Sequence, residues 1–277
     1  MTIATVRTCT PIHLLAMLAL ITVAAGCSHQ AKDSGLSAAD TKHIEIRDVA
    51  AGTWAKMVVF SSNSSALGIS SKTRIARYVL LELTKSDNQL KAQEKTCDIT
   101  SVSSGGSALT IPQAFKNAVT SNAYNYVLTE SDHVAALTMT EAVEVLGANI
   151  EDKLRSTLPT SADDSRIIDQ DGDGNPGVTV EVAAKALFTI KGRVYLVQRT
   201  IWSERAIIND ATKITGLVTW IPEQKTLGSS NSILTTVAPS ITAIASESTF
   251  VMAKIPDGSS CGTMLNQRDQ LFPLLKI

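Results

Sequence analysis

The chain has 277 residues, 25 of them basic and 26 acidic, with four cysteines and only 4% aromatic residues. The balanced charge argues against nucleic acid as a partner, and the lack of a lysine cluster argues against an anionic lipid surface. The few aromatic residues argue mildly against stacking platforms for sugars or single strands. Frequent Ser, Thr, Val and Ile favour a β-rich fold. The length allows one large domain or two small ones.

The first 27 residues have the layout of a secretory signal peptide. Arg7 precedes an apolar run at 12–25, and this run is shorter than the roughly 20 residues that a membrane-spanning helix needs. The segment 23–27 (VAAGC) resembles the bacterial lipobox, in which a peptidase cuts before a cysteine that then carries the lipid, although leucine is commoner in the place of Ala24. Cys27 is therefore the expected lipidation site. The alternative is an ordinary signal peptide with an incidental cysteine.

These features divide the chain into a signal peptide (residues 1–26), a lipidated flexible tether (27–45) and one β-domain (46–277). The tether is predicted to be flexible because it has small and polar residues without apolar periodicity. Two or more acyl chains anchor firmly, since each buried CH₂ contributes about 0.8 kcal/mol. By resemblance to enterobacterial lipoproteins, Ser28 indicates sorting to the outer membrane. The expected location is therefore the bacterial cell envelope, on the periplasmic or surface face.

From about residue 46 the apolar residues follow the spacing of β-strands. In the first half of the domain, Ser- and Asn-rich turn signals separate the runs. The strands expected there are 53–61, 74–84, 89–101 and 124–129. A Gly/Ser loop is expected at 101–107, and a short helix at 110–118 capped by Thr110. Residues 134–150 fit a strand or a helix, and the strand-like runs on both sides favour a strand.

The second half of the domain has the pattern of a meander. The runs expected as strands are 178–183, 186–190, 193–208, 211–221, 233–237 and 249–255. Lys191-Gly192 and Asn209-Asp210 are predicted to be tight hairpin turns, and a short helix is expected at 263–275. Roughly eight to ten strands at this spacing predict a mainly β fold: a single antiparallel β-barrel (calycin-like) or a β-sandwich, with one or two short helices.

Two cysteines remain in the β-domain once Cys9 is removed with the signal peptide and Cys27 is lipidated. Cys97 and Cys261 are expected to form a disulfide, because an exported chain folds in an oxidising compartment. In the chain-entropy model so long a loop would stabilise the fold by up to roughly 4–5 kcal/mol. The alternative is two free thiols.

The segment 169–177 (DQDGDGNPG) is the densest group of chemically functional residues in the chain. Carboxylates at alternate positions, followed by glycine, match the first half of a calcium loop. The side chains of Asp169, Asp171 and Asp173 and the backbone carbonyl of Asn175 are expected to bind a structural calcium ion.

The same segment departs from an EF-hand. The twelfth position of the loop is Val180 instead of glutamate, and a strand follows in place of a helix. Because calcium prefers about six to eight oxygens, Asp163, Asp164 or water would have to complete the site. The alternative is an acidic, glycine-rich turn that binds no metal.

The chain contains no recognisable catalytic motif, so the sequence predicts a protein that is not an enzyme. A Ser-His-Asp site would have to use His133, beside Asp132, and there is no G-x-S-x-G elbow. P-loop, H-E-x-x-H and C-x-x-C motifs are absent as well. His133 is better explained as an exposed loop residue. Trp54, Trp202 and Trp220 lie in predicted strands and are expected to fill or line the barrel.

One combination of segments resembles uncharacterised exported lipoproteins of myxobacteria and related bacteria. The acidic segment reads D-x-D-x-D-G-x-P-G-V-T and is preceded by Leu158-Pro159-Thr160 and Asp164. A Y-x-V-x-R strand (195–199) and an S-x-F-x-M strand (248–252) follow, and the cysteines of the domain fit the same pattern. The resemblance covers about half of the mature chain and implies no established activity.

The function expected from these features is binding by a membrane-anchored envelope lipoprotein. Its partners would be the lipid bilayer, through acylated Cys27, and an apolar small molecule inside the barrel or another molecule at its surface. An envelope hydrolase with an unidentified active site and a purely structural envelope protein are the alternatives. The sequence does not indicate the oligomeric state.

Overall fold

The computed structural model describes residues 51–273 except 67, 120, 132–133, 186–188 and 236–238. The chain divides into two compact units, Met1–Thr41 and Lys42–Ile277, and every described residue belongs to the second. The predicted signal peptide (1–26), the lipidation site Cys27 and the predicted tether (27–45) lie outside the described residues.

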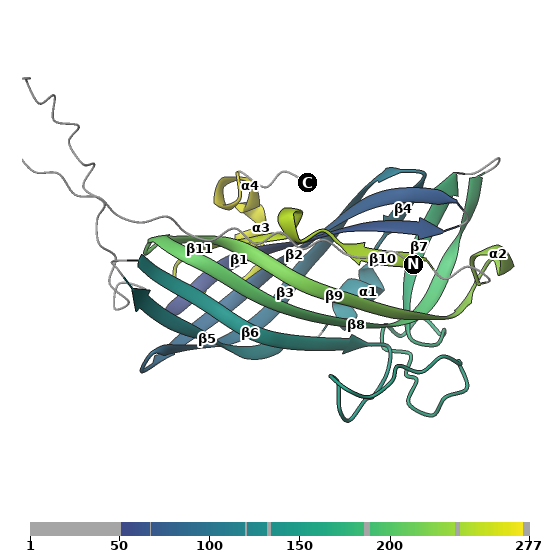
Figure 1. Cartoon of the computed structure of the whole chain (residues 1–277), viewed down its shortest axis with the longest axis horizontal. Coiled ribbons are helices and arrows are strands. Elements are labelled where there is room, and N and C mark those ends of the chain that lie inside the picture. Colours follow the sequence, from purple (N-terminus) through teal and green to yellow (C-terminus); the bar gives the residue numbers. More distant parts are fainter. Residues whose placement is uncertain are drawn as a thin grey trace, which may run out of the picture. The chain divides into compact units, whose positions relative to one another are not determined.

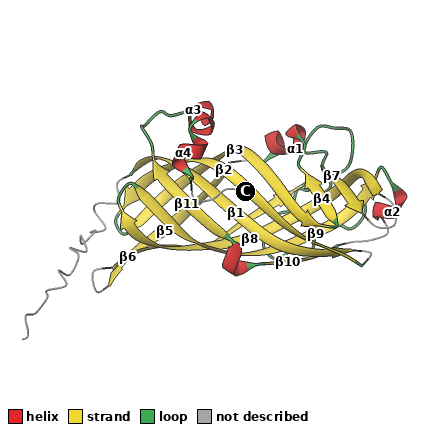
Figure 2. Cartoon of the chain, turned by 90° about the horizontal axis from the view of Figure 1, so that it is seen from above, coloured by secondary structure: helices red, strands yellow, loops and turns green. Residues whose placement is uncertain are grey.

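Within the described residues, eight antiparallel strands form a closed ring (Figure 1, Figure 2). In chain order they are β1 (Gly52–Ala66), β2 (Ile69–Ser86), β3 (Gln89–Gly105), β5 (Asn122–Ser131), β6 (Val134–Leu146), β8 (Thr189–Asp210), β9 (Lys213–Ser229) and β11 (Thr249–Lys254). Each strand pairs with the next in this series, and β11 pairs with β1. This is the connectivity of an up-and-down β-barrel. The predicted mainly β, antiparallel fold is confirmed, and the ring corresponds to the barrel alternative.

Three shorter strands extend one end of the ring, which we call the distal end. There β7 (Val178–Lys185) pairs with the first part of β8, and β4 (Ser107–Thr110) pairs with β7. On the other side, β10 (Ser240–Ala243) pairs with the last part of β1. We call the opposite end, where β2 turns into β3 and β8 into β9, the proximal end.

The helices are short. α1 (Gln113–Ala118) lies between β4 and β5 in the chain, and α2 (Ser232–Thr235) and the 3-10 helix η2 (Ala245–Glu247) flank β10. α3 (Cys261–Asn266) and α4 (Arg268–Leu271) lie on the outside of the barrel (Figure 1). There Met264 and Phe272 pack against outward-facing Met57 and Tyr78.

Strand β1 explains why one of the predicted runs is apolar on both faces. Successive side chains of a strand point to opposite sides. Trp54 and Val58 belong to the interior cluster, whereas Met57 and Val59 pack with the residues of α3 and α4, and all four are at most 3% exposed. A strand buried on both faces needs a nearly continuous apolar sequence.

Large side chains fill the proximal part of the barrel. Burying one large apolar side chain contributes roughly 1.5–3 kcal/mol, so this interior cluster is the main stabilising feature of the fold. All three tryptophans belong to it, which confirms the prediction that they fill or line the barrel. Its buried members are Trp54, Val58, Val79, Leu81, Leu83, Leu90, Ala92, Tyr124, Tyr126, Leu128, Ala135, Leu137, Met139, Trp202, Ala206, Ile208, Ile214, Val218, Trp220, Phe250 and Met252.

Several predicted elements are present with shifted boundaries. Residues 134–146 form strand β6, the predicted helix at 110–118 is α1, and the tail contains α3 and α4. The predicted cap of α1 is wrong, because Thr110 is the last residue of β4 and pairs with Glu181. The N-cap position is Pro112, which makes no side-chain cap hydrogen bond.

The predicted hairpin turn at Lys191-Gly192 is wrong. Both residues lie inside β8, where Gly192 pairs with Val182 of β7. A Cβ atom at Gly192 would lie 2.9 Å from a side-chain carbon of Leu234 and 3.1 Å from Asn231. The glycine therefore allows the α2 segment to pack closely on the strand and does not mark a turn.

The predicted turn at Asn209-Asp210 is wrong by two residues. β8 continues to Asp210, which pairs with Lys213 of β9, so the turn consists of residues 211–212. β9 then runs through the polar residues after 222 as far as Ser229, because this part pairs with the distal half of β8.

Two further predictions are corrected at the distal end. The expected Gly/Ser loop at 101–107 is mostly strand, since β3 continues to Gly105. Gly105 has a φ of 101°, and a Cβ there would lie 2.6 Å from the Ser70 carbonyl oxygen, so only glycine fits this change of direction. The run 233–237 begins within helix α2, where the side chain of Asn231 accepts a hydrogen bond from the Ile233 N–H at 3.2 Å.

Candidate functional site

A cavity of about 200 Å³ occupies the distal part of the barrel. Strands β1 and β2 form one wall, and β7, β8 and β9 form another, with residues of β4, β10 and α2 also in contact with the cavity. Apolar side chains predominate, among them Ile75, Val180, Val194 and Leu196. The cavity exists because the long ring strands continue past the filled interior and are joined there by the three short strands.

Aromatic side chains form the floor of the cavity. Trp220 lines the cavity and also belongs to the interior cluster. Its ring centroid lies 5.2 Å from that of Phe60, which in turn lies 6.5 Å from that of Trp202. The indole N–H of Trp220 donates a hydrogen bond to Ser248 at 3.0 Å. The floor is therefore fixed by packing and by one buried hydrogen bond.

The polar lining groups are uncharged with one exception. Ser62 lies on β1, and Gln198 and Gln224 lie opposite each other on β8 and β9. Glu223 is the one charged residue among the described lining residues. Its carboxylate accepts a hydrogen bond from Nε of Arg199 at 2.9 Å and is therefore already paired.

Arg199 also fixes the long connection between β6 and β7. Its Nη1 group donates to the carbonyl oxygens of Lys153, Leu154 and Ser156 at 3.1, 3.3 and 2.7 Å. Only 8% of Arg199 is exposed. The outside of the β8 wall is thus covered by a loop held through charge-assisted hydrogen bonds.

The size and lining of the cavity suit a small apolar molecule. Its volume is slightly larger than that of an engineered apolar cavity of ~150 Å³ that binds benzene, and smaller than the ~300–1,000 Å³ of typical ligand pockets. A single ring or the end of one acyl chain would fit inside, and a longer ligand would extend through the open side of the cavity. An eight-stranded barrel is just wide enough either to be filled by side chains or to hold one such ligand.

The acidic segment forms a compact loop before β7. One carboxylate oxygen from each of Asp169, Asp171 and Asp173 lies within 4.8 Å of the other two. The backbone N–H of Gly174 donates to Asp169 at 2.9 Å, and that of Thr179 donates to Asp171 Oδ2 at 2.8 Å. The structure therefore brings together the three carboxylates that the sequence predicts to bind calcium.

One oxygen in this loop lacks a partner. Asp171 Oδ1 is buried and makes no hydrogen bond within the described residues. Burial raises the pKa of Asp171, and repulsion from Asp173 and Asp169 raises it further. A buried carboxylate oxygen without a donor is unfavourable, and a bound cation would remove this penalty.

The other predicted ligands are placed differently. Both the backbone N–H and the side-chain amide of Asn175 donate to Asp173 Oδ1, at 2.9 and 3.0 Å. Asp164 accepts hydrogen bonds from the Arg166 guanidinium, which lowers the pKa of its carboxyl group to about 2. Asp164 is therefore already paired with a cation, and the side chain of Asp163 is exposed.

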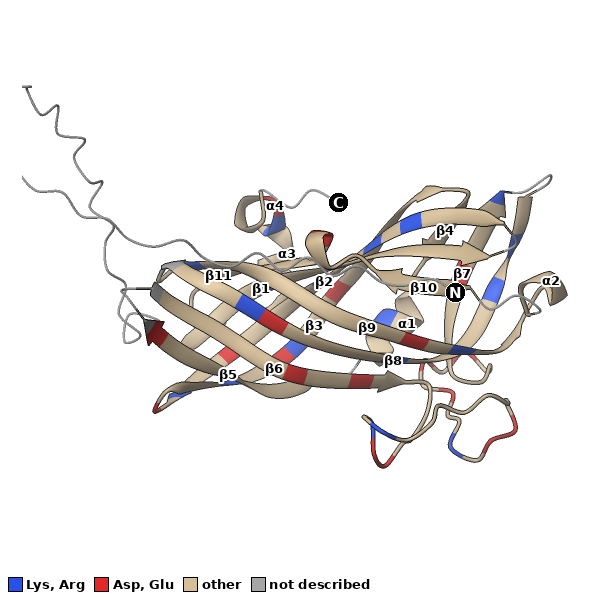
Figure 3. Ribbon diagram, viewed as in Figure 1, with Lys and Arg blue, Asp and Glu red and all other residues tan. Residues whose placement is uncertain are grey.

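A network of charged side chains that the sequence predictions did not include is buried in the barrel interior. Figure 3 shows acidic residues on β6 and mixed charges on the loop that follows. Lys56 Nζ donates to both oxygens of Glu204 at 2.7 and 2.8 Å. Arg77 donates to both oxygens of Glu144 at 3.1 and 3.2 Å and lies 3.1 Å from Glu94.

Two tyrosines connect these ion pairs. Tyr124 donates to Glu94 at 2.5 Å and Tyr126 to Glu204 at 2.6 Å, while Lys56 donates to both hydroxyl groups at 3.0 and 2.9 Å. Burial, together with Glu94 and Glu204 nearby, raises both tyrosine pKa values well above the usual value. The phenols therefore stay protonated and act as donors. None of these charged residues lines the cavity, so we assign the network to the fold.

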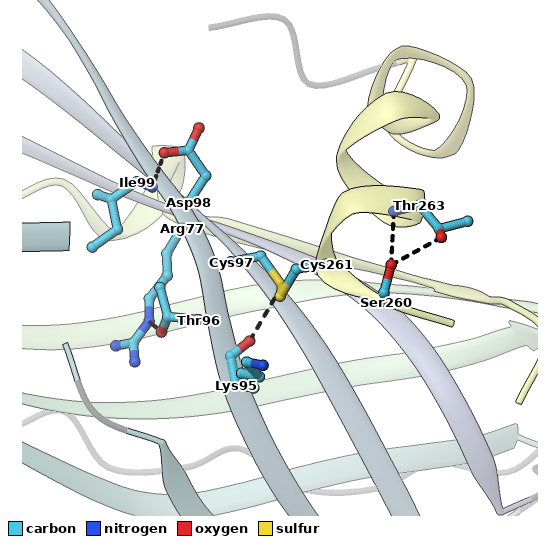
Figure 4. Close-up of a disulfide and its surroundings, with 9 residues drawn as sticks. All are labelled: Arg77, Lys95, Thr96, Cys97, Asp98, Ile99, Ser260, Cys261 and Thr263. Carbon is cyan, nitrogen blue, oxygen red and sulfur yellow. Dashed lines mark hydrogen bonds between the residues drawn. A yellow bond between two sulfur atoms is a disulfide. The ribbon is translucent and has the colours of Figure 1, made fainter. Parts of the chain in front are cut away.

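The structure joins Cys97 and Cys261, the two cysteines predicted to pair, in a disulfide (Figure 4). Their Cα atoms are 5.3 Å apart, although 164 positions separate them in the chain. Cys97 lies on β3 and Cys261 begins α3, so the bond ties the C-terminal helices to the wall of the barrel.

The only histidine named as a catalytic candidate, His133, lies outside the described residues together with Asp132. Among the described helices, none has both the length and the apolar character needed to cross a bilayer.

The described part of the chain thus belongs to the class of up-and-down antiparallel β-barrels with an apolar cavity at one end. No family model, curated protein or solved structure matches this chain. The resemblance to myxobacterial lipoproteins therefore stays a prediction.

Proposed function

We propose that this protein is a lipid-anchored binding protein of the bacterial cell envelope, and that its distal cavity holds an apolar small molecule. The observation that carries the proposal is the cavity itself, with apolar walls and an aromatic floor. An apolar ligand that enters it gains roughly 25 cal/mol for each Å² removed from water. The lining offers apolar surface and hydrogen-bonding groups, so we propose binding without a chemical reaction.

The membrane anchor rests on the sequence of the first 27 residues. Acylation of Cys27 would place the barrel at the outer membrane, where apolar molecules are concentrated. Labelling cells with radioactive palmitate is expected to label the wild-type protein but not a Cys27→Ala variant. Equal labelling of the two proteins, or no labelling of either, would contradict the anchor.

We also propose a structural calcium ion in the acidic loop, held by Asp169, Asp171 and Asp173, with Asn175 as a further ligand. The buried and unpartnered Asp171 Oδ1 supports a cation at this place. The same aspartate accepts a hydrogen bond from Thr179 of β7, and the next residue, Val180, lines the cavity. A cation here would stabilise the beginning of one cavity wall.

Ligand binding is tested with the predicted mature chain (residues 27–277) carrying Cys27→Ser, which lacks both the apolar signal peptide and the lipid. The uncharged fluorescent probe N-phenyl-1-naphthylamine is expected to bind and to be quenched or displaced by an apolar competitor. Val194→Phe should reduce the space in the cavity and weaken binding. Ile207→Phe is the control, because Ile207 is 55% exposed on the outer face of β8.

Native mass spectrometry of the lipidated protein from its own host would show a co-purified ligand, calcium and the oligomeric state together. If neither probe binding nor a co-purified molecule is found, the binding proposal is wrong and the purely structural alternative remains.

A further inference from the structure

We infer that the cavity selects uncharged amphiphiles, meaning a single chain or ring that carries one hydroxyl or carbonyl group. This inference rests on the proposed binding function and specifies its ligand class. Three features carry it: the apolar volume, the absence of an available charge among the described lining residues, and a set of uncharged hydrogen-bonding groups.

The described lining of the cavity offers no charged group that is free to bind an ion. Among the described lining residues, Glu223 is the one that carries a charge, and its carboxylate is bound by the Arg199 guanidinium. A carboxylate or ammonium group moved from water into the cavity would therefore find no opposite charge. Desolvating an ion without a partner costs several kcal/mol, far more than desolvating a hydroxyl group that finds a hydrogen bond.

The cavity does offer uncharged hydrogen-bonding groups. Gln198 and Gln224 are direct cross-strand neighbours on β8 and β9, and both line the cavity. Gln198 donates from its amide nitrogen to Thr200 at 3.1 Å. Within the described protein, the side chain of Gln224 makes no hydrogen bond, and neither does the hydroxyl of Ser62, which is only 6% exposed. These groups can donate to and accept from a ligand.

The polar and apolar groups occupy different parts of the lining. Polar groups lie on β1, β8 and β9, while Trp220 closes the floor and Val180, Val194 and Leu196 supply apolar wall. One small polar group of a ligand would satisfy Gln224 or Ser62, and its apolar part would fill the remaining space. A hydrocarbon alone would leave these polar groups without partners.

The test compares three ligands with the same ten-carbon chain: 1-decanol, decanoate and decylammonium. Each competes with N-phenyl-1-naphthylamine on the mature chain (residues 27–277) carrying Cys27→Ser, at pH 7.5. Decanol is expected to displace the probe at concentrations at least about tenfold lower than either ion, because only the ions lose hydration without a partner.

Two substitutions of Gln224 sharpen the test. Gln224→Leu, which removes the hydrogen-bonding group, should weaken decanol binding by roughly threefold to tenfold, with the affinity of the probe measured separately for each variant. Gln224→Arg should reverse the preference between decanol and decanoate. Circular dichroism establishes that both variants fold, and Thr219→Leu on the exposed outer face of β9 is the matched control.

The outcomes separate the two proposals. Probe binding with equal displacement by decanol and decanoate would overturn the selectivity and leave the binding function standing. Selectivity for decanol that is unaffected by both Gln224 variants would overturn the assigned hydrogen-bonding group. Failure of the probe and of all three competitors to bind would overturn the proposed function itself.

Discussion

The ammonium nitrogen of Lys56 lies 2.7 Å from the carboxylate of Glu204, and neither side chain has any exposed surface. The two residues are 148 positions apart and come from β1 and β8, which are not neighbours in the ring. Their contact therefore crosses the barrel interior. Such a pair disfavours any register that separates the two charges, because each charge would then be buried alone.

Removing one member of this pair should therefore destabilise the fold strongly. Glu204→Gln is expected to lower the free energy of unfolding by about 3–5 kcal/mol, since it leaves Lys56 as a buried charge without its main partner. The double variant Lys56→Met/Glu204→Gln should recover a large part of this loss. Urea unfolding followed by tryptophan fluorescence measures both.

The exposed pair Lys72–Glu247 provides the control. Its side chains are 39% and 40% exposed, and exposed ion pairs contribute less than about 1 kcal/mol. Lys72→Met should accordingly have little effect. If Glu204→Gln and Lys72→Met destabilise the protein equally, the interior ion pair contributes no more to stability than the exposed one.

The same network predicts how stability depends on pH. Burial alone would raise the pKa of Glu94, but Arg77 and Lys56 outweigh this effect and lower the pKa below the usual 4.5. The contribution of Glu94 is therefore fully present above pH 4.5 and is lost as the pH falls through the lower pKa of the folded state. Urea unfolding at a series of pH values should show this decline below pH 4.5.

Glu94→Gln is expected to be less stable at pH 7 but to lose less further stability on acidification, because the group that titrates has been removed. Wild-type and variant curves that fall in parallel between pH 5 and 3 would show that Glu94 does not cause the decline.

The charged network was only partly predictable from sequence. Lys56 and Arg77 stand at inward-facing positions of predicted apolar runs, the first between Trp54 and Val58. A charge at such a position indicates a buried partner, and this signal was available. The identity of the partners could not be predicted, because only the order of the strands in the ring brings Glu204 close to Lys56.

The cavity could not be predicted from sequence either, because it too depends on which strands pair. The sequence favours a barrel with an apolar ligand as one possibility, but the walls depend on β7 and β10 pairing with parts of β8 and β1 that extend past the filled interior. Helix α2 also contributes Leu234 from a run that was expected to be a strand. The apolar pattern of a single strand does not show where along the barrel the filled interior ends and the cavity begins.

The disulfide should stabilise the attachment of the C-terminal helices. The double variant Cys97→Ala/Cys261→Ala is expected to lose about 2–5 kcal/mol of stability, and protease should cut the α3–α4 segment faster. Wild-type protein treated with dithiothreitol should behave like the double variant, and the variant itself should not respond to dithiothreitol. Unchanged stability on reduction would mean that packing of Met264 and Phe272 alone holds these helices.

Calcium should stabilise the protein through the acidic loop. A ligand that binds only the folded state at one hundred times its Kd adds about 2.7 kcal/mol, which for a domain of this size corresponds to a rise in Tm of roughly 5–10 °C. Asp171→Asn should abolish this rise, because Asp171 supplies the buried oxygen that lacks a partner. Scanning calorimetry with and without millimolar calcium measures the effect.

The control for this variant is Glu151→Gln, an exposed residue of the same long connection between β6 and β7 that lies outside the cluster. It should keep the full response to calcium. Without calcium, Asp171→Asn is expected to be at least as stable as the wild type, since it relieves repulsion from Asp169 and Asp173. A wild-type Tm that does not change with calcium would leave the loop as an acidic turn without metal, and the β7 wall would then rely on its pairing with β8 alone.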